Sequence, residues 1–321
     1  MDRPIYPLCT IDWSNLQKRD AEERNKLLNA CQIDGFFFLD LSSDAALLRD
    51  WDSLLEFMAE YFNRPLNEKM QDNRHSDTHG YEPVATSAGV VANLPDYYES
   101  LKASKDEIFE KNVALPSAVL SKHALFERFL SKAQHIVMTI LRELDVALDR
   151  KQGLSFEQAH RTDRSSLSTL GMLHYPKQDS ISVGVGHNKH TDLGTLTFLL
   201  CRQWGLEVLS PDGSGWKSVE PKANYAVINV GDTLRFLSDN RLRSAIHRVI
   251  PTEHLQRESR YTIAYFLRSE NDVIFKDSLG RIVSAEQWHH EKFNVFRESH
   301  ELQESRPIAT GGMERADILI K

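Results

Sequence analysis

Apolar residues recur at helical spacing through much of the first 150 residues. Leu27 and Cys31 share one helical face, and apolar side chains return three or four positions apart in residues 51–62. A longer run at 125–148 repeats the same spacing and is typical of an amphipathic helix. The run 36–39 is continuously apolar and predicts a short buried strand. We therefore expect a mainly helical N-terminal region, 1–150.

After residue 164 the pattern changes to short segments rich in Thr, Val, Leu, Tyr and Phe, separated by turn residues. Short strands at near-regular spacing are typical of a sandwich or jelly roll. The chain returns to helical or irregular structure over 284–321, so we expect one α+β unit with its β core in 151–283. The expected strands are Leu167–Tyr175, His187–Asp192, Thr195–Cys201, Gly205–Leu209, Trp216–Val219, Tyr225–Val230, Ser244–Val249 and Tyr261–Leu267.

Composition narrows the class of protein. The formal net charge is −7 and no dense Lys/Arg run is present, which argues against a nucleic-acid partner. No apolar run approaches the ~20 residues that span a bilayer, and the N-terminus does not resemble a signal peptide. The 3 widely spaced cysteines form neither a disulfide framework nor a zinc pattern. We therefore expect a cytoplasmic protein without a membrane or nucleic-acid partner; the oligomeric state is not readable from the sequence.

Three residues form a candidate metal site. His190 and Asp192 are two apart in an expected strand, so their side chains point to the same face. His247 lies further along the chain, within another strand-like run. Two imidazoles and one carboxylate are the facial triad of non-haem Fe(II) oxygenases, and they leave coordination positions open for a co-substrate and dioxygen. The sequence therefore predicts an iron site at these three residues.

A candidate carboxylate site follows. Arg260 and Thr262 share one face of the last expected strand, where a guanidinium and a hydroxyl can hold a carboxylate. Arg257 and Ser259 match the same pattern, but they lie in a wholly polar stretch, which favours Arg260. Phe266 shares the face of Arg260 and is a candidate for contact with the substrate.

Taken together, these motifs resemble the isopenicillin N synthase-like branch of the Fe(II)/2-oxoglutarate-dependent dioxygenases, which includes many plant and fungal biosynthetic enzymes. The family's His-Thr-Asp-x-Gly-x-Leu-Thr-x-Leu motif is matched at 190–199. Further matches lie at 30–37, 229–232, 244–249 and 260–266, so the similarity extends over most of the chain.

The resemblance implies a distorted double-stranded β-helix, or jelly roll, flanked by N-terminal and C-terminal helices. It implies Fe(II) bound by His190, Asp192 and His247, and 2-oxoglutarate bound by Arg260 and Thr262. Tyr175 occupies the tyrosine position of the family's Asn-x-Tyr-Pro motif and is expected to reach 2-oxoglutarate, whereas the asparagine is replaced by a leucine.

The implied reaction consumes dioxygen, converts 2-oxoglutarate to succinate and carbon dioxide, and oxidises a C–H bond by hydroxylation, desaturation or rearrangement. Ascorbate is expected to support it, and the substrate is expected to be a small organic molecule such as a secondary-metabolite intermediate. One alternative is an oxidase of the isopenicillin N synthase type, in which Arg260 and Thr262 hold the substrate's own carboxylate. Another is a non-catalytic binding protein on the same fold.

Two further histidine positions are interpreted as structural. His187 precedes His190 by three residues and is expected to lie off its strand face, as a structural or supporting group. His289 and His290 lie in a polar helical stretch beside Glu291 and are interpreted as surface residues.

Overall fold

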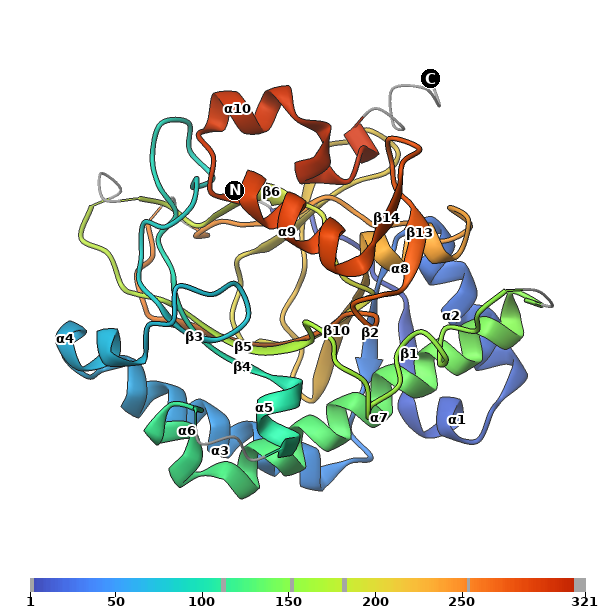
Figure 1. The fold of residues 1–321 in the computed structure, drawn as a ribbon, viewed down its shortest axis with the longest axis horizontal. Helices are drawn as coiled ribbons and strands as arrows, with labels where there is room; N and C mark the ends of the chain where they lie inside the picture. The colour runs from blue at the N-terminus through green and yellow to red at the C-terminus, as the bar shows by residue number, and fades with distance from the viewer. Residues whose placement is uncertain (1–2, 111–113, 151–152, 181–183, 253–254, 315–321) are drawn as a thin grey trace.

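The computed structural model describes residues 3–110, 114–150, 153–180, 184–252 and 255–314. Its largest element is an eight-stranded sheet, the large sheet, with the order β1-β2-β10-β7-β12-β5-β4-β3 (Figure 1). The strands are β1 (Thr10–Asp12), β2 (Phe36–Asp40), β3 (Gly80–Glu82), β4 (Glu99–Ser104), β5 (Thr169–Tyr175), β7 (Leu196–Leu200), β10 (Tyr225–Val230) and β12 (Arg260–Leu267).

A four-stranded sheet, the small sheet, has the order β6-β11-β8-β9. Residues of both sheets line one cavity, so the two sheets form the halves of a jelly roll. This α+β jelly roll is the fold predicted from the strand spacing, and each of the eight expected strands is present. The strands of the small sheet are β6 (His187–His190), β8 (Leu206–Leu209), β9 (Trp216–Ser218) and β11 (His247–Val249); β13 (Ile274–Lys276) pairs with β14 (Ile282–Ser284) outside both sheets.

Side chains along β12 point alternately to the two faces of the large sheet. Arg260, Thr262 and Phe266 face the cavity. The intervening Ile263 and Tyr265 are fully buried on the other face, in the main hydrophobic core. That face packs against the helical layer formed by α2 (Ala21–Ile33), α3 (Ala45–Phe62) and α7 (His123–Ala147) (Figure 1).

The N-terminal helix-to-strand connection shows how local sequence sets these elements. The Asp20 side chain accepts a hydrogen bond from the backbone N–H of Glu23, which caps the start of α2. Gly35 ends the helix with a φ of +67°, and a Cβ there would lie 2.2 Å from the carbonyl oxygen of Arg243. A glycine is therefore required for the chain to turn directly from α2 into β2.

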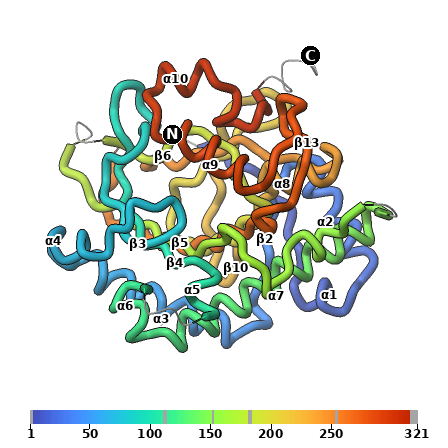
Figure 2. The backbone as a smooth tube through the Cα atoms, in the orientation of Figure 1, coloured from blue at the N-terminus to red at the C-terminus, as the bar shows by residue number. Residues whose placement is uncertain are grey.

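The C-terminal helices α9 (Ala285–Phe296) and α10 (His300–Ser305) lie on the opposite side of the molecule from α3 and α7, as Figure 2 shows. Trp288 of α9 is fully buried against Phe236 of α8 (Asp232–Leu237) and donates a hydrogen bond to the carbonyl oxygen of Leu193. These contacts anchor α9 beside the loop that follows β6. The remaining helices are α1 (Trp13–Gln17), α4 (Leu66–Lys69), α5 (Lys105–Glu110) and α6 (Ser117–Ser121), with 3₁₀ turns at Met70–Asp72 and Pro307–Thr310.

Within the described ranges, no helix combines the length and the apolar character needed to cross a bilayer. Helices α1 to α7 all lie before residue 150, and the same part of the chain supplies β1 to β4 to the large sheet.

Candidate active site

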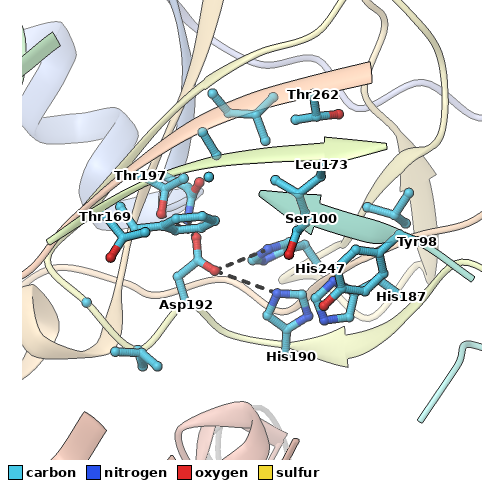
Figure 3. A pocket seen from close by; sticks show the side chains of 18 of the residues that line it. Tyr98, Ser100, Thr169, Leu173, His187, His190, Asp192, Thr197, His247 and Thr262 are labelled. Atoms are coloured by element: carbon cyan, nitrogen blue, oxygen red, sulfur yellow. Dashed lines mark hydrogen bonds and ion pairs between the residues drawn. The ribbon is translucent and has the colours of Figure 1, made fainter. Parts of the chain in front are cut away.

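His190 and His247 are direct partners across the β6–β11 pairing, so their imidazoles lie side by side, with ring centroids 4.3 Å apart. Asp192 lies two residues beyond the end of β6. Its Oδ1 is 3.6 Å from Nε2 of His190 and 3.7 Å from Nε2 of His247 (Figure 3). The structure therefore brings together the three side chains of the predicted triad, with one ligand atom of each directed at a common point.

Hydrogen bonds orient all three side chains. Nδ1 of His190 bonds to the carbonyl oxygen of Asn188 at 2.8 Å, and Nδ1 of His247 bonds to that of Ala245 at 3.2 Å. Because a carbonyl only accepts, each Nδ1 carries the proton and each Nε2 presents a lone pair to the site. The triad is thus arranged to bind a cation through two imidazole nitrogens.

The second oxygen of Asp192 is held by two residues of the large sheet. Thr197 donates to Oδ2 at 2.5 Å, and the side-chain amide of Asn229 donates to it at 2.7 Å. Burial raises the pKa of Asp192, but His247, His190 and Asn229 outweigh it and hold that pKa well below its usual range. Burial lowers the pKa of His247 to about 4, with a contribution from His190.

The triad therefore combines one carboxylate oxygen with two imidazole Nε2 atoms. This donor set fits Fe(II), which accepts mixed nitrogen and oxygen ligands in an octahedral arrangement. No cysteine is among the described residues that line the cavity. These residues therefore do not offer the thiolate ligands that are typical of a cysteine-bound zinc site or an iron–sulfur cluster.

Arg260 and Thr262 lie on the large sheet, at one end of the cavity. Arg260 is 2% exposed, and its Nη1 donates to Oγ1 of Thr262 at 2.7 Å. Its Nε donates to the carbonyl oxygen of Trp204, and its guanidinium lies over the ring of Tyr175. Among the residues that the structure describes, no carboxylate lies within ion-pairing distance of Arg260, so its charge remains available to an anion. Arg257 is exposed and does not line the cavity.

Tyr175 and Phe266 also line the cavity. Burial raises the pKa of Tyr175 above its usual range, so its hydroxyl remains a neutral donor at physiological pH. Tyr98, which directly precedes β4, packs against the Tyr175 ring. Leu173, which occupies the position of the family's asparagine, lines the same cavity and adds an apolar wall (Figure 3).

The expected positions of two histidines are wrong. His187 does not lie off the site: its ring lines the cavity, stacked between His190 at 4.4 Å and Tyr98 at 4.9 Å (Figure 3). The register shift between β6 and β11 breaks the simple alternation that underlay the expectation. His289 is 1% exposed because α9 turns it toward Asp77, whereas His290 is exposed as expected.

Sequence reasoning also missed residues that support the triad. Asn229 and Thr197 lie inside matched motifs, but only the structure shows that both donate to Asp192. Lys292 of α9 is fully buried, where it forms an ion pair with Asp232 and donates to the hydroxyl of Thr191, between His190 and Asp192. A lone lysine in a helix carries no pattern that predicts such a contact.

Two family models match the chain. The model of the 2OG-Fe(II) oxygenase superfamily matches residues 167–269, which contain the triad and Arg260. The model described as the N-terminal region of the non-haem dioxygenase in morphine synthesis matches residues 8–117. The two matches together cover α2 and α3 of the helical layer and every strand of the large and small sheets.

Similar proteins are found among fungal enzymes. The oxidoreductase vrtI of Penicillium aethiopicum is 58% identical over 98% of this chain and 77% of its own length. The 2-oxoglutarate-dependent dioxygenase frbH of Dothideomycetidae sp. (strain 11243) is 58% identical over 96% of both chains. A full-length Neurospora crassa protein, solved in complex with alpha-KG, shares the fold, with a TM-score of 0.73, 20% identity and coverage of 92% of this chain and 99% of that one. With relatives this similar over nearly its whole length, the chain belongs to the 2OG-Fe(II) oxygenase superfamily, as its motifs predict.

Proposed function

We propose that His190, Asp192 and His247 bind Fe(II), and that Arg260 and Thr262 bind the distal carboxylate of 2-oxoglutarate. As a member of the superfamily, the protein is a non-haem Fe(II)- and 2-oxoglutarate-dependent dioxygenase. The observation that carries the proposed assignment is the convergence of the two Nε2 atoms and the Asp192 carboxylate in a cavity that also contains a buried arginine.

The charge on Arg260 supports its proposed role. A buried guanidinium without a carboxylate partner among the described residues is costly unless an anion accompanies it. A dianionic co-substrate supplies that anion at its distal end while its oxo-acid end is directed toward the triad. Tyr175 is placed to donate a further hydrogen bond, and Leu173 and Leu199 provide apolar walls for the carbon chain.

Iron and 2-oxoglutarate, when bound, supply the oxidative decarboxylation of 2-oxoglutarate to succinate and carbon dioxide by dioxygen, coupled to oxidation of a C–H bond. The residues of the chain hold the ligand side chains in position and exclude water from the reacting groups. Asn229 and Thr197 keep Asp192 oriented, and the backbone acceptors keep the proton on Nδ1 of each histidine. The two sheets enclose the reacting groups in a mostly apolar cavity.

We further propose that the substrate is a small organic molecule, which Phe266 contacts, and that it is an intermediate of secondary metabolism. The similarity to fungal enzymes such as frbH and the apolar lining of the cavity support this class. The cytoplasmic location expected from the sequence stays a prediction, and imaging of a fluorescent fusion tests it.

Replacement of His247 by Ala tests the metal assignment. The variant should lose at least about tenfold in Fe(II) affinity in an anaerobic titration, because one of three protein ligands is removed. His135→Ala is a matched control, since His135 is exposed on α7 outside the cavity. Equal affinity in wild type and His247→Ala would refute the assignment.

Succinate formation tests the use of 2-oxoglutarate. Wild-type enzyme with iron, oxygen and ascorbate should convert 2-oxoglutarate to succinate, whereas an oxidase of the isopenicillin N synthase type would leave it unused. Arg260→Ala should raise the KM for 2-oxoglutarate, because it removes charge-assisted hydrogen bonds to the distal carboxylate. Arg257→Ala is the control, and an equal KM in wild type and Arg260→Ala would favour another anion site.

A further inference from the structure

A second buried arginine, Arg268, lines the cavity far from Arg260. It directly follows β12 and continues the alternation of Arg260, Thr262 and Phe266, so it projects from the same inward face. The two arginines are eight positions apart along extended chain, so their Cα atoms are separated by roughly 26 Å. Thr262 accepts a hydrogen bond from Arg260, and Thr169 accepts one from Arg268. Figure 3 shows these two threonines at opposite ends of the site.

The guanidinium of Arg268 forms fewer hydrogen bonds to described residues than it has N–H donors. Arg268 is 9% exposed, and its Nη1 donates to two neutral acceptors, the carbonyl oxygen of Leu167 and the hydroxyl of Thr169. Its Nε is buried and makes no hydrogen bond to a described residue. No carboxylate of the described chain lies within ion-pairing distance of it. A buried cation with spare donors is stabilised by an anion supplied from outside the protein.

The other cations at this end of the cavity already have acidic partners. Lys102 lines the cavity and lies 2.6 Å from a carboxylate oxygen of Glu82. Arg297 does not line the cavity itself, but it lies 2.8 Å from a carboxylate oxygen of the lining residue Asp77. Their charges are therefore compensated within the protein. Arg268 is the cation in this part of the described cavity that is left for a ligand.

The surroundings of Arg268 also suit the rest of such a ligand. The guanidinium lies 5.8 Å from the ring centroid of Phe266, and Phe293, Phe296 and Leu193 line the same part of the cavity. Phe266 pairs with Thr197 across β12 and β7, and Thr197 donates to Asp192. This end of the cavity is thus apolar and adjoins the triad.

We infer that Arg268 binds a carboxylate of the substrate, which makes the substrate a small carboxylic acid with an apolar or aromatic body. This inference rests on the proposed function, in which Arg260 at the other end is occupied by 2-oxoglutarate. Arg268 then selects the substrate by charge, and the aromatic wall formed by Phe266, Phe293 and Phe296 accepts its body.

Matched acids and amides test the inference on the enzyme loaded with Fe(II) and saturating 2-oxoglutarate under nitrogen. The probes are 3-phenylpropanoate with 3-phenylpropanamide and octanoate with octanamide, and calorimetry measures each Kd. In at least one pair the acid should bind about tenfold or more tightly than its amide, because only the acid forms charge-assisted hydrogen bonds. Equal affinities within both pairs would overturn the inference.

Variants locate the effect. Arg268→Gln should abolish the preference for the acid, and Arg268→Lys should retain part of it, because lysine keeps the charge without the planar fork. Arg297→Gln is the control and should keep the preference, since Arg297 is already paired with Asp77. If Arg268→Gln weakens acid and amide equally, Arg268 has only a packing role and the inference is wrong.

Two further readouts keep the test decisive. Circular dichroism checks the folding of Arg268→Gln. If that variant does not fold, Arg268→Lys decides the question. A lower affinity for the acid but not for the amide supports the inference, and no selective loss of affinity for the acid overturns it. Binding of 2-oxoglutarate is measured in the same series. Absence of that binding would contradict the proposed function, whereas normal binding without acid preference would contradict only the role of Arg268.

Discussion

The two carboxylate oxygens of Asp192 have different environments. Oδ1 faces His190 and His247, and Oδ2 accepts hydrogen bonds from Thr197 and Asn229. The donors to Oδ2 prevent the carboxylate from rotating, so Oδ1 stays directed at the shared point between the imidazoles. Residues that hold a ligand in this way tune metal affinity without touching the metal.

Thr197→Val removes one of these donors while it keeps the β-branched shape. We expect the affinity for Fe(II) to fall by roughly tenfold, since the carboxylate loses one of the two bonds that orient it. An anaerobic titration measures the change. Thr139→Val is the control, because among the described residues the Thr139 hydroxyl bonds only to the carbonyl oxygen of His135, within α7. Unchanged affinity in Thr197→Val would show that Asn229 alone orients Asp192.

Asp96 gives the protein a pH-sensitive residue outside the triad. It is 0% exposed; one oxygen accepts hydrogen bonds from the backbone N–H groups of Ala85 and Thr86, and the other has no partner among the described residues. Burial raises the pKa of Asp96 to about 7, from an ordinary value of 3.8. The folded state therefore holds its proton more tightly than the unfolded state does.

The free energy of unfolding should therefore decrease as pH rises from about 4 to 7, by on the order of 1–3 kcal/mol from this residue, and then level off. Asp96→Asn keeps the acceptor oxygen and removes the charge, so it should flatten this dependence and stabilise the protein at pH 8. Urea unfolding at several pH values measures both effects. A variant as pH-dependent as wild type between these values would contradict the assignment.

At the scale of elements, α9 is connected to the triad through a buried ion pair. Lys292 of α9 and Asp232, the first residue of α8, are both fully buried. Lys292 also donates to Thr191 at 2.6 Å, and the backbone N–H of Asp232 donates to the carbonyl oxygen of Asp192 at 2.8 Å. The C-terminal helix thus helps to position the loop that carries a metal ligand.

Lys292→Met should lower the free energy of unfolding by about 3–5 kcal/mol, because it leaves the buried charge of Asp232 without its main partner. Urea unfolding measures the loss. Lys26→Met breaks an ion pair between the partly exposed Lys26 and Glu23 on α2, and it should change stability by less than about 1 kcal/mol. An equal loss in the free energy of unfolding for both substitutions would contradict the claim that burial makes the Lys292–Asp232 pair more costly to break.

The helices and strands were predicted with unequal success, for physical reasons. The apolar periodicity at 125–148 predicts α7 closely, because one face of this long helix packs on the sheet. All eight expected strands of the core are present. The short strands β1, β3, β13 and β14 escaped prediction, because three residues are too few to show a period. The six-residue strand β4 was also not predicted. The position of His289 depends on how α9 is rotated against Asp77, which periodicity in a polar helix does not reveal.

At the scale of the whole molecule, the proposed ligands connect the two sheets. The triad histidines belong to β6 and β11 of the small sheet, whereas Arg260 and Tyr175 belong to the large sheet. Iron and 2-oxoglutarate bound together would therefore contact both halves of the jelly roll. Ligands that bind only the native state stabilise it in proportion to their saturation.

Mn(II), used as an oxygen-stable replacement for Fe(II), should raise the melting temperature, and 2-oxoglutarate should raise it further. Each ligand at about 100 times its Kd contributes about 2.7 kcal/mol. His247→Ala should lose most of the shift from the metal. Arg260→Ala should keep the shift from the metal and lose most of the added shift from 2-oxoglutarate; differential scanning fluorimetry measures both. A full added shift in Arg260→Ala would place the distal carboxylate elsewhere.

The division into segments 1–150, 151–283 and 284–321 stays a prediction. The large sheet takes β1 to β4 from the first segment, and α9 of the last packs beside the loop after β6. Neither outer segment is therefore isolated from the β core in its contacts.

The sequence alone determined the residue types of the site, because His190-x-Asp192, His247 and Arg260-x-Thr262 combine metal and carboxylate chemistry with strand spacing. It also determined the fold class, since alternating and helical periodicities are local properties of the chain. Only the tertiary structure placed His187, Arg268 and Lys292 at the cavity or beside the triad. Their roles depend on the register of β6 against β11 and on the packing of distant segments, and no local pattern encodes those contacts.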